Sequence, residues 1–173
     1  MSRNVEIKAR IESIESMSLR AAAIADRGPT RITQDDTFFV CPKGRLKLRL
    51  LAPEEGQLIY YLRPDRKGPK ESFYVISPTA SPETLCEALA RACGLLGRVR
   101  KERTLYLAGR ARIHLDRVEG LGDFLELEVV LEPGENASSG EAIARDLMRR
   151  LDILPDQLVE GAYIDLLVGQ RDA

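Results

Sequence analysis

The chain of 173 residues is 44% apolar and has no stretch that resembles a long linker, so we expect a single domain over residues 1–173. The 26 Lys and Arg residues nearly balance the 27 Asp and Glu residues, which argues against a nucleic-acid partner or a polybasic membrane patch. No apolar run approaches the roughly 20 residues of a membrane helix, and charges occupy residues 1–10 where a signal peptide would be apolar, so we expect a cytoplasmic protein.

The first half of the chain predicts four strands and one helix. Residues 3–11 alternate strictly, with Val5, Ile7 and Ala9 on one face and charged side chains on the other. The apolar spacing then becomes helical over residues 13–27, and Gly28 with Pro29 is predicted to end that helix. Strands bounded by turn residues are predicted over residues 30–40, 45–51 and 57–64.

The second half predicts the same order of elements again. A strand over residues 70–77 precedes a helix over 81–93, with Ser81 as its N-cap and Pro82 at its first position. Further strands are predicted over residues 98–107, 110–118 and 124–132. The order strand, helix and three strands therefore occurs twice, at 3–64 and 70–132, which we interpret as a topological repeat.

The end of the chain predicts further helical structure. A loop over residues 132–140 precedes an amphipathic helix that contains Ile143, Leu147 and Leu151. Residues 154–167 are predicted to form a short helix or a turn with a packed tail.

Eight strands with mostly tight turns predict an α+β fold built on an antiparallel sheet large enough to close into a barrel. Charged strand faces are usually solvated, and for any single strand this ordinary interpretation stays open. Three amphipathic helices, however, need apolar surface to cover, and the apolar strand faces provide it if they lie outside the barrel. The charged faces would then line its interior.

Carboxylates gather on the last two predicted strands. Glu126 and Glu128 lie on one face, opposite Leu125 and Leu127, and Asp116 ends the preceding strand. Two anions about 6 Å apart repel by roughly 3 kcal/mol at an effective dielectric constant of about 20, so they require a shared proton, a basic side chain or a divalent cation. We interpret them as a site for Mg²⁺ or Mn²⁺, which choose oxygen ligands.

The predicted interior would also hold many cations. They would repel one another by a few kcal/mol for each close pair unless a polyanion occupied the space. A chain of phosphates fits, because Arg and Lys donors match phosphate oxygens. The cations predicted to face inward are Lys8, Arg10, Lys47, Arg49, Lys70, Lys101, Arg103 and Arg112, with Arg45 and Arg63 near a mouth.

Six segments in order resemble the CYTH, or triphosphate tunnel metalloenzyme, superfamily. They are VEIKAR at 5–10, RLKLR at 45–49, GPKES at 68–72, RKERTLYL at 100–107, RIHLDRVEGLGDFLELEV at 112–129 and GAYIDLL at 161–167. The superfamily includes class IV adenylyl cyclases, thiamine triphosphatases and inorganic triphosphatases. The sequences of the last two segments are most similar to the class IV cyclase-like branch.

The resemblance implies an eight-stranded tunnel, open at both ends, that binds a small-molecule triphosphate with Mg²⁺ or Mn²⁺. It implies metal ligation by Glu6, Asp116, Glu126 and Glu128. It implies phosphate binding by Lys8, Arg10, Lys47, Arg49, Lys70, Lys101, Arg103 and Arg112, with Lys8, Lys101 and Arg103 as the catalytic residues. Asn4 stands where the family has a first glutamate, which removes a charge from a second metal position.

Two enzymatic functions follow from the resemblance, and a third function stays open. A cyclase would convert ATP to cyclic AMP and pyrophosphate, whereas a triphosphatase would hydrolyse thiamine triphosphate, inorganic tripolyphosphate or a nucleoside triphosphate. The third is a non-catalytic sensor of nucleotides or polyphosphate. For each of these functions we expect a monomer or homodimer.

Three features of the sequence carry open alternatives. The aromatic residues Tyr60, Tyr61, Phe73 and Tyr74 supply either a stacking surface for a base or ordinary core. His114, the only histidine, either enters the tunnel or is structural. Residues 161–167 either close one mouth or pack as a tail.

Overall fold

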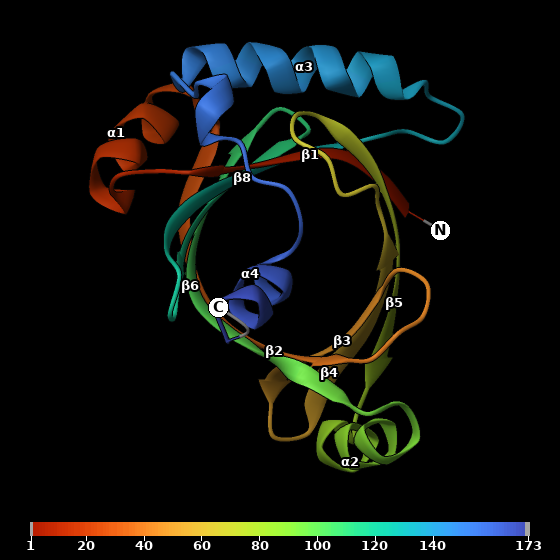
Figure 1. The fold of residues 1–173 in the computed structure, drawn as a ribbon. Coiled ribbons are helices and arrows are strands. Elements are labelled where there is room, and N and C mark those ends of the chain that lie inside the picture. The colour runs from red at the N-terminus through yellow and green to blue at the C-terminus, as the bar shows by residue number, and fades with distance from the viewer. Residues whose placement is uncertain (1, 172–173) are drawn as a thin grey trace.

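The alternating strands close into a barrel in a computed structural model that describes residues 2–171 (Figure 1). Every neighbouring pair is antiparallel, in the order β1-β5-β4-β3-β2-β6-β7-β8 around the ring. The predicted closed α+β barrel is therefore confirmed. The strands are β1 (Ser2–Arg10), β2 (Arg27–Phe39), β3 (Arg45–Ala52), β4 (Glu55–Leu62), β5 (Lys70–Thr79), β6 (Leu95–Ala108), β7 (Ala111–Val118) and β8 (Gly122–Val130).

The pairing of the strands bears out the topological repeat. Each of the strands β1 to β4 corresponds to one of β5 to β8, in order. Replacing every strand by its counterpart leaves the ring of neighbours unchanged: β4–β3 becomes β8–β7, for example, and β1–β5 stays β1–β5. The two halves of the chain therefore share one barrel: β4-β3-β2 and β6-β7-β8 are continuous runs, whereas β1 and β5 each lie between strands of the other half. The helices are α1 (Ile14–Ile24), α2 (Pro82–Cys93), α3 (Ala137–Arg150), a 3₁₀ helix (Pro155–Gln157) and α4 (Tyr163–Arg171).

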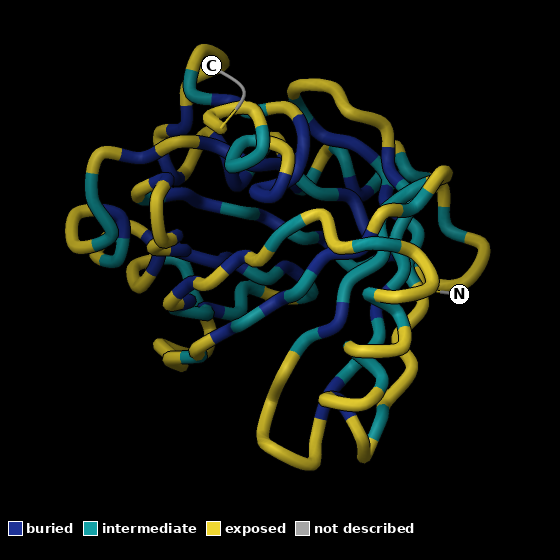
Figure 2. The backbone as a smooth tube through the Cα atoms, turned by 60° about the horizontal axis from the view of Figure 1, so that its bottom comes forward, coloured by how far each residue is buried: buried dark blue, intermediate teal, exposed yellow. Residues whose placement is uncertain are grey.

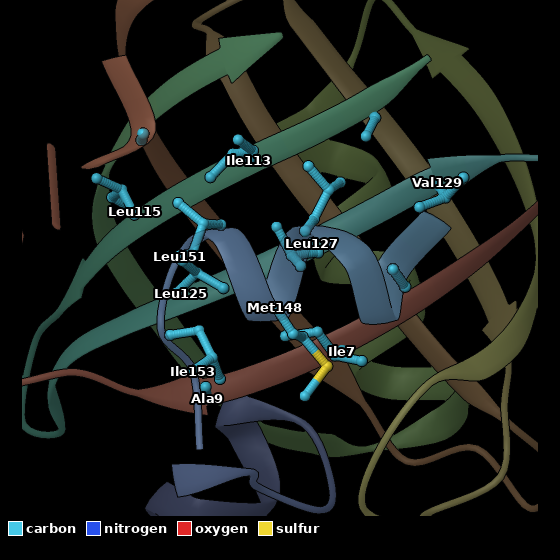
Figure 3. Packing of buried hydrophobic residues seen from close by; sticks show 14 of the residues in the cluster. Ile7, Ala9, Ile113, Leu115, Leu125, Leu127, Val129, Met148, Leu151 and Ile153 are labelled. Carbon is cyan, nitrogen blue, oxygen red and sulfur yellow. The ribbon is translucent and has the colours of Figure 1, made fainter. Parts of the chain in front are cut away.

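One apolar core lies outside the barrel, where α1 and α3 cover β1, β7 and β8 (Figures 1 and 3). Outward-facing Ile7, Leu125 and Leu127 belong to one core with Leu147 of α3 and with Leu151, which directly follows that helix. Figure 2 shows buried backbone running along the strands, with exposed segments at the turns. The predicted inversion, with apolar faces outward, is confirmed for this half of the barrel.

The opposite wall is covered less completely. Helix α2 lies over one end of β2, β3 and β4, but outward-facing Leu50 and Val75 are exposed. The expectation that helices cover the apolar faces therefore holds for β1, β7 and β8 and only in part for β3 to β5.

The predicted boundaries of α1 were wrong at its C-terminal end. The helix ends at Ile24 instead of residue 27, and the backbone is already extended at Ala25. The Asp26 amide donates to the Leu107 carbonyl at 2.7 Å, and Arg27 pairs with Leu107. Gly28 and Pro29 therefore lie within β2, because pairing with β6 begins before the predicted helix stop.

The loop before α3 is also shorter than predicted. The Asn136 side chain accepts a hydrogen bond from the Ser138 amide at 3.1 Å, so the helix begins at Ala137 instead of after residue 140. An asparagine in this position satisfies a backbone N–H that would otherwise have no partner at the helix start.

No helix within residues 2–171 is both long enough and apolar enough to cross a membrane.

Candidate functional site

Charged side chains line a cavity of about 360 Å³ in the centre of the barrel. The strand residues of the lining, charged and uncharged, occupy even-numbered positions of β1, β2, β5, β7 and β8 and odd-numbered positions of β3, β4 and β6, as strand alternation requires. Among the described residues the lining has seven cations and four carboxylates, so its charge favours an anion. The charged lining residues are Glu6, Lys8, Asp36, Lys47, Arg49, Arg63, Lys101, Arg103, Arg112, Glu126 and Glu128, together with His114.

The acidic side of the bore is formed by β1, β7 and β8. Strand register places Glu128 opposite both Glu6 and Arg112, and Glu126 opposite both Lys8 and His114. Lys8 lies 3.2 Å from Glu126, and Arg112 lies 3.4 Å from Glu128. The carboxylates predicted from the alternation of this stretch thus lie together at one wall.

The two glutamates on β8 differ in electrostatic environment. Burial opposes ionisation of Glu126, but Lys8, Lys101 and Arg103 together hold its pKa well below the usual value. Burial instead raises the pKa of Glu128, and Glu6 and Glu126 raise it further against the influence of Arg103. Of these two glutamates, Glu128 therefore has the weaker stabilisation of its negative charge by basic side chains.

A group of donor atoms on this wall fits a divalent cation. Ligand atoms of His114, Glu126 and Glu128 all lie within 4.8 Å of one another. The buried His114 Nδ1 has no hydrogen-bond partner among the described residues. Glu6 lies outside this group and is ion-paired with Arg63.

Lys47 and Arg49 on β3 form a basic wall with Asp36 on β2. Asp36 accepts hydrogen bonds from Lys47 Nζ at 2.6 Å and from Arg49 Nε and Nη2 at 2.8 and 2.9 Å. Burial by itself would raise the Asp36 pKa, but these cations hold it below its usual value. Burial also lowers the pKa of Lys47 to about 8.

A second aspartate, Asp116, lies behind two more cations. It accepts hydrogen bonds from Lys101 Nζ at 2.8 Å, from Arg103 Nε and Nη2 at 2.6 Å each, and from the Tyr163 hydroxyl at 3.0 Å. Arg103 Nη2 also reaches Glu126 at 2.5 Å. Asp116 therefore orients basic side chains and lies apart from the His114, Glu126 and Glu128 donor group.

Two residues predicted to bind phosphate lie away from the bore lining. Arg10 is exposed, with its guanidinium 4.7 Å from the Phe124 ring centre and a hydrogen bond of 3.2 Å to the Leu121 carbonyl. Lys70 is fully buried and donates to the Arg66 carbonyl at 2.8 Å.

The C-terminal segment covers one mouth of the barrel. Figure 1 shows α4 within the ring of strands, and Tyr163 with Ala162 lines the cavity. Inward-facing Phe38, Val99 and Phe124 pack against this segment in a second apolar core, and Lys8 Nζ lies 3.7 Å from the Tyr163 ring centre. Apolar bore residues therefore hold the tail at one opening of the barrel, as one of the two alternatives for residues 161–167 predicts.

The other end has an apolar rim. Ile32, Tyr74, Ile76 and Leu105 line the cavity toward the end of the barrel where β1 begins. Of the four aromatic residues singled out in the sequence, Tyr61 and Tyr74 line the bore. Asn4, which replaces the family glutamate, is buried in the lining, and its Oδ1 has no hydrogen-bond partner among the described residues.

Sequence reasoning missed Asp36 and Tyr163 as parts of the site. Asp36 follows Gln34 and precedes Phe38 at the same alternating spacing, which was a signal for the bore side of β2. Tyr163 had no such signal, since its position depends on how the tail docks.

A closed eight-stranded barrel with charged side chains inside and apolar faces outside defines the triphosphate tunnel class of folds. The chain belongs to the CYTH domain family, whose model matches residues 2–163.

Solved structures have the same fold. A Pyrococcus horikoshii protein is 25% identical, with a TM-score of 0.83, over 94% of this chain and 98% of that one. A proposed adenylate cyclase from Vibrio parahaemolyticus is 16% identical, with a TM-score of 0.73, over 95% and 97%. A Hippeastrum protein, proposed to be an adenylyl cyclase and described with a dominant triphosphatase activity, is 16% identical, with a TM-score of 0.66, over 98% and 96%. No curated protein sequence matches the chain.

Proposed function

We propose that this protein binds an organic triphosphate together with Mg²⁺ or Mn²⁺ in the bore and cleaves it. The first candidate reaction is that of class IV adenylyl cyclases, in which ATP yields cyclic AMP and pyrophosphate. The observation that carries the proposal is that Lys47 and Arg49 share one cavity with the His114, Glu126 and Glu128 donor group. β3 and β8 are four strands apart in either direction around the ring, so these two groups are on opposite walls.

The electrostatics of the bore support a bound polyanion. Among residues 2–171, Lys47 and Arg49 share a single carboxylate, Asp36, so one positive charge on that wall has no partner there. Two unit charges 4 Å apart interact by about 4 kcal/mol at an effective dielectric constant of about 20, which makes an uncompensated cation costly. A phosphate chain supplies the missing charge and accepts the directional hydrogen bonds of the guanidinium.

Each wall has its own task in the proposed reaction. Glu126, Glu128 and His114 would hold the divalent cation, with Glu6 as a further carboxylate nearby. A divalent cation held by these residues would supply positive charge that stabilises the phosphate oxygens. Lys47 and Arg49 would bind the departing pyrophosphate, and Lys8, Lys101 and Arg103 would position the phosphate chain against the acidic wall. Such fixed charges contribute most to phosphoryl chemistry.

The apolar rim favours a substrate with an organic group. Ile32, Tyr74, Ile76 and Leu105 offer apolar and aromatic surface beside the open mouth, whereas tripolyphosphate has nothing to place there. In the cyclase reaction the ribose 3′ oxygen forms a bond to the α-phosphorus, the bond from that phosphorus to the β-phosphate oxygen breaks, and the hydroxyl proton is released.

The covered mouth favours a second candidate, hydrolysis of the terminal phosphate. A terminal phosphate at that end would lie beside Lys8 and Lys101, under Tyr163. A substrate that enters through the other mouth has no further group beyond this terminal phosphate. Water would therefore be the nucleophile there.

Product analysis tests the proposal. The protein is incubated with ATP, thiamine triphosphate or tripolyphosphate under Mg²⁺ or Mn²⁺. Cyclic AMP with pyrophosphate supports the cyclase, orthophosphate supports the hydrolase, and metal-dependent binding without product contradicts both and indicates a sensor.

Glu128→Gln tests the acidic wall. We expect turnover to fall by more than about 100-fold, because a charge that stabilises the cation is lost, while the thermal unfolding midpoint changes little. Glu87→Gln, on the exposed face of α2, is the matched control. Wild-type turnover in folded Glu128→Gln would contradict the proposed site.

A further inference from the structure

The His114 ring lies near both glutamates of β8, Glu126 and Glu128, with no hydrogen bond to either. Its Nδ1 is 3.8 Å from Glu128 Oε1 and 4.0 Å from Glu126 Oε2, and the residue is 4% exposed. These separations exceed hydrogen-bonding distance. Nδ1 is also without any hydrogen-bond partner among residues 2–171.

A buried polar atom without a partner costs about 1–3 kcal/mol, so a histidine in this position calls for an additional group. Two ligands of one six-coordinate ion at roughly 2.1 Å lie about 3.0–4.2 Å apart. Both distances from Nδ1 to the carboxylate oxygens fall in this interval. Ligand atoms of all three residues lie within 4.8 Å of one another, so the nitrogen and the two carboxylates are close enough to share one cation.

We propose that His114 Nδ1 is a ligand of the divalent cation together with Glu126 and Glu128, and that this nitrogen makes the site prefer Mn²⁺ over Mg²⁺. The inference rests on the proposed metal-dependent function and adds a ligand and a metal preference to it. Imidazole suits first-row transition metals, whereas Mg²⁺ is bound through oxygen and keeps much of its water shell.

The surroundings keep the imidazole available as a ligand. The Nδ1 atom has no hydrogen-bond partner among the described residues, so no contact within the folded chain competes with a metal for it. Arg103 and Lys8 each bind one oxygen of Glu126. An ionised carboxylate has about four acceptor sites, so Glu126 can keep these contacts and still bind a cation.

The single histidine of the chain allows a direct spectroscopic test. Untagged protein is prepared with ¹⁵N only in histidine, loaded with Mn²⁺ alone and measured by electron spin-echo envelope modulation. We expect ¹⁴N modulation in unlabelled protein and its replacement by ¹⁵N frequencies in labelled protein. Spectra that do not change on labelling would overturn the proposal, because His114 would then not bind the metal.

Metal titrations of His114→Gln test the preference. We expect Mn²⁺ affinity to fall by at least about tenfold, since even outer-shell partners of metal ligands contribute 10–100-fold, and Mg²⁺ affinity to change by less than about threefold. Ser72→Ala, elsewhere in the lining, should change neither affinity. An unchanged ratio of Mn²⁺ to Mg²⁺ affinity in His114→Gln would overturn the preference.

Glu128→Gln separates this inference from the proposed function. If Glu128→Gln loses metal binding while His114→Gln keeps the wild-type affinities, only the role of His114 fails. If both His114→Gln and Glu128→Gln bind the two metals with wild-type affinity, the role of His114 and the metal site of the proposed function both fail.

Discussion

Two clusters of the same composition occupy different parts of the barrel wall and differ in their charge balance. In the first cluster, Asp36 lies opposite Arg49 in strand register, with Lys47 two residues away on β3. In the second cluster, Asp116 lies opposite Arg103, with Lys101 two residues away on β6. The topological repeat relates the strand pair β2–β3 to β6–β7, and the aspartate and the cations exchange strands between the halves.

The clusters differ in what else they contact. Lys101 and Arg103 also approach Glu126, and Asp116 accepts a further hydrogen bond from Tyr163. The Lys101 and Arg103 side chains are 5% and 8% exposed, against 14% and 16% for Lys47 and Arg49. The same three residue types thus form a neutral, enclosed network in one half and a partly open, positively charged surface in the other. We infer that the first cluster mainly binds the ligand and the second mainly holds the site together.

Asp116→Asn should have the largest effect on stability. Removing this charge leaves Lys101 and Arg103 buried with less compensation, and breaking a buried pair costs about 3–5 kcal/mol. Chemical denaturation should show a loss of this size in the free energy of unfolding.

Asp36→Asn is the matched comparison for that prediction. It should cost about 1–3 kcal/mol, because Lys47 and Arg49 retain more contact with solvent in the bore. Equal losses in the two variants would contradict the difference between the clusters.

Lys47→Met should weaken tripolyphosphate binding by about 10–100-fold, the range expected for one charge-assisted hydrogen bond. The free energy of unfolding should change by less than about 1 kcal/mol, because Asp36 keeps Arg49 as its partner. Isothermal titration calorimetry and denaturation measure the two quantities. Lys101→Met should lose more of the free energy of unfolding than Lys47→Met and less of the affinity for tripolyphosphate. A greater loss of affinity in Lys101→Met than in Lys47→Met would reverse the roles of the two clusters.

The affinity for tripolyphosphate should fall as the pH rises above about 8. Burial lowers the pKa of Lys47 to that value, Asp36 opposes the shift, and Arg49 and Lys101 add to it, while Tyr61 faces the ammonium with its ring. A bound anion favours the charged lysine, so the complex binds more protons than the free protein, and the affinity falls by up to about tenfold per pH unit.

Stability should move in the other direction. The folded-state pKa of Lys47 is below its unfolded value, so the unfolded chain binds more protons in this range, and this lysine makes the free energy of unfolding rise with pH. Lys47→Met should reduce both slopes. Slopes identical to those of the wild type would show that another group titrates.

Tyr163→Phe should lower the free energy of unfolding by about 1–1.5 kcal/mol, a smaller loss than that of Asp116→Asn, because one hydrogen bond to Asp116 disappears. Tyr61, which contacts the first cluster through its ring, supplies the control variant Tyr61→Phe. Tyr61→Phe should lower the free energy of unfolding by less than about 0.5 kcal/mol. A larger loss would show that the first cluster depends on its tyrosine hydroxyl as the second cluster does.

Strand alternation was enough to predict much of the fold and of the bore lining. The period of two placed Glu6, Lys8 and Glu128 on the face opposite the residues that α1 and α3 cover, and they lie in the bore. The pattern could not predict Asp36 as the partner of Lys47, because that contact depends on register between strands.

The inner apolar core was also beyond the sequence pattern. Phe38 and Val99 face inward at one mouth, and their partners come from α4, far away along the chain. Alternation gives the face of each residue but not which tail segment will cover it. For the same reason the buried contacts of Lys70 and the exposed position of Arg10 were not predicted.

Anomalous diffraction at the manganese edge, from crystals grown with Mn²⁺ and tripolyphosphate, would locate the metal and the phosphates together. We expect a manganese peak bounded by His114, Glu126 and Glu128, with phosphate density that reaches Lys47 and Arg49 on the opposite wall. Manganese bound away from these carboxylates, or phosphate bound outside the bore with Lys47 and Arg49 contacting only Asp36, would contradict this expectation.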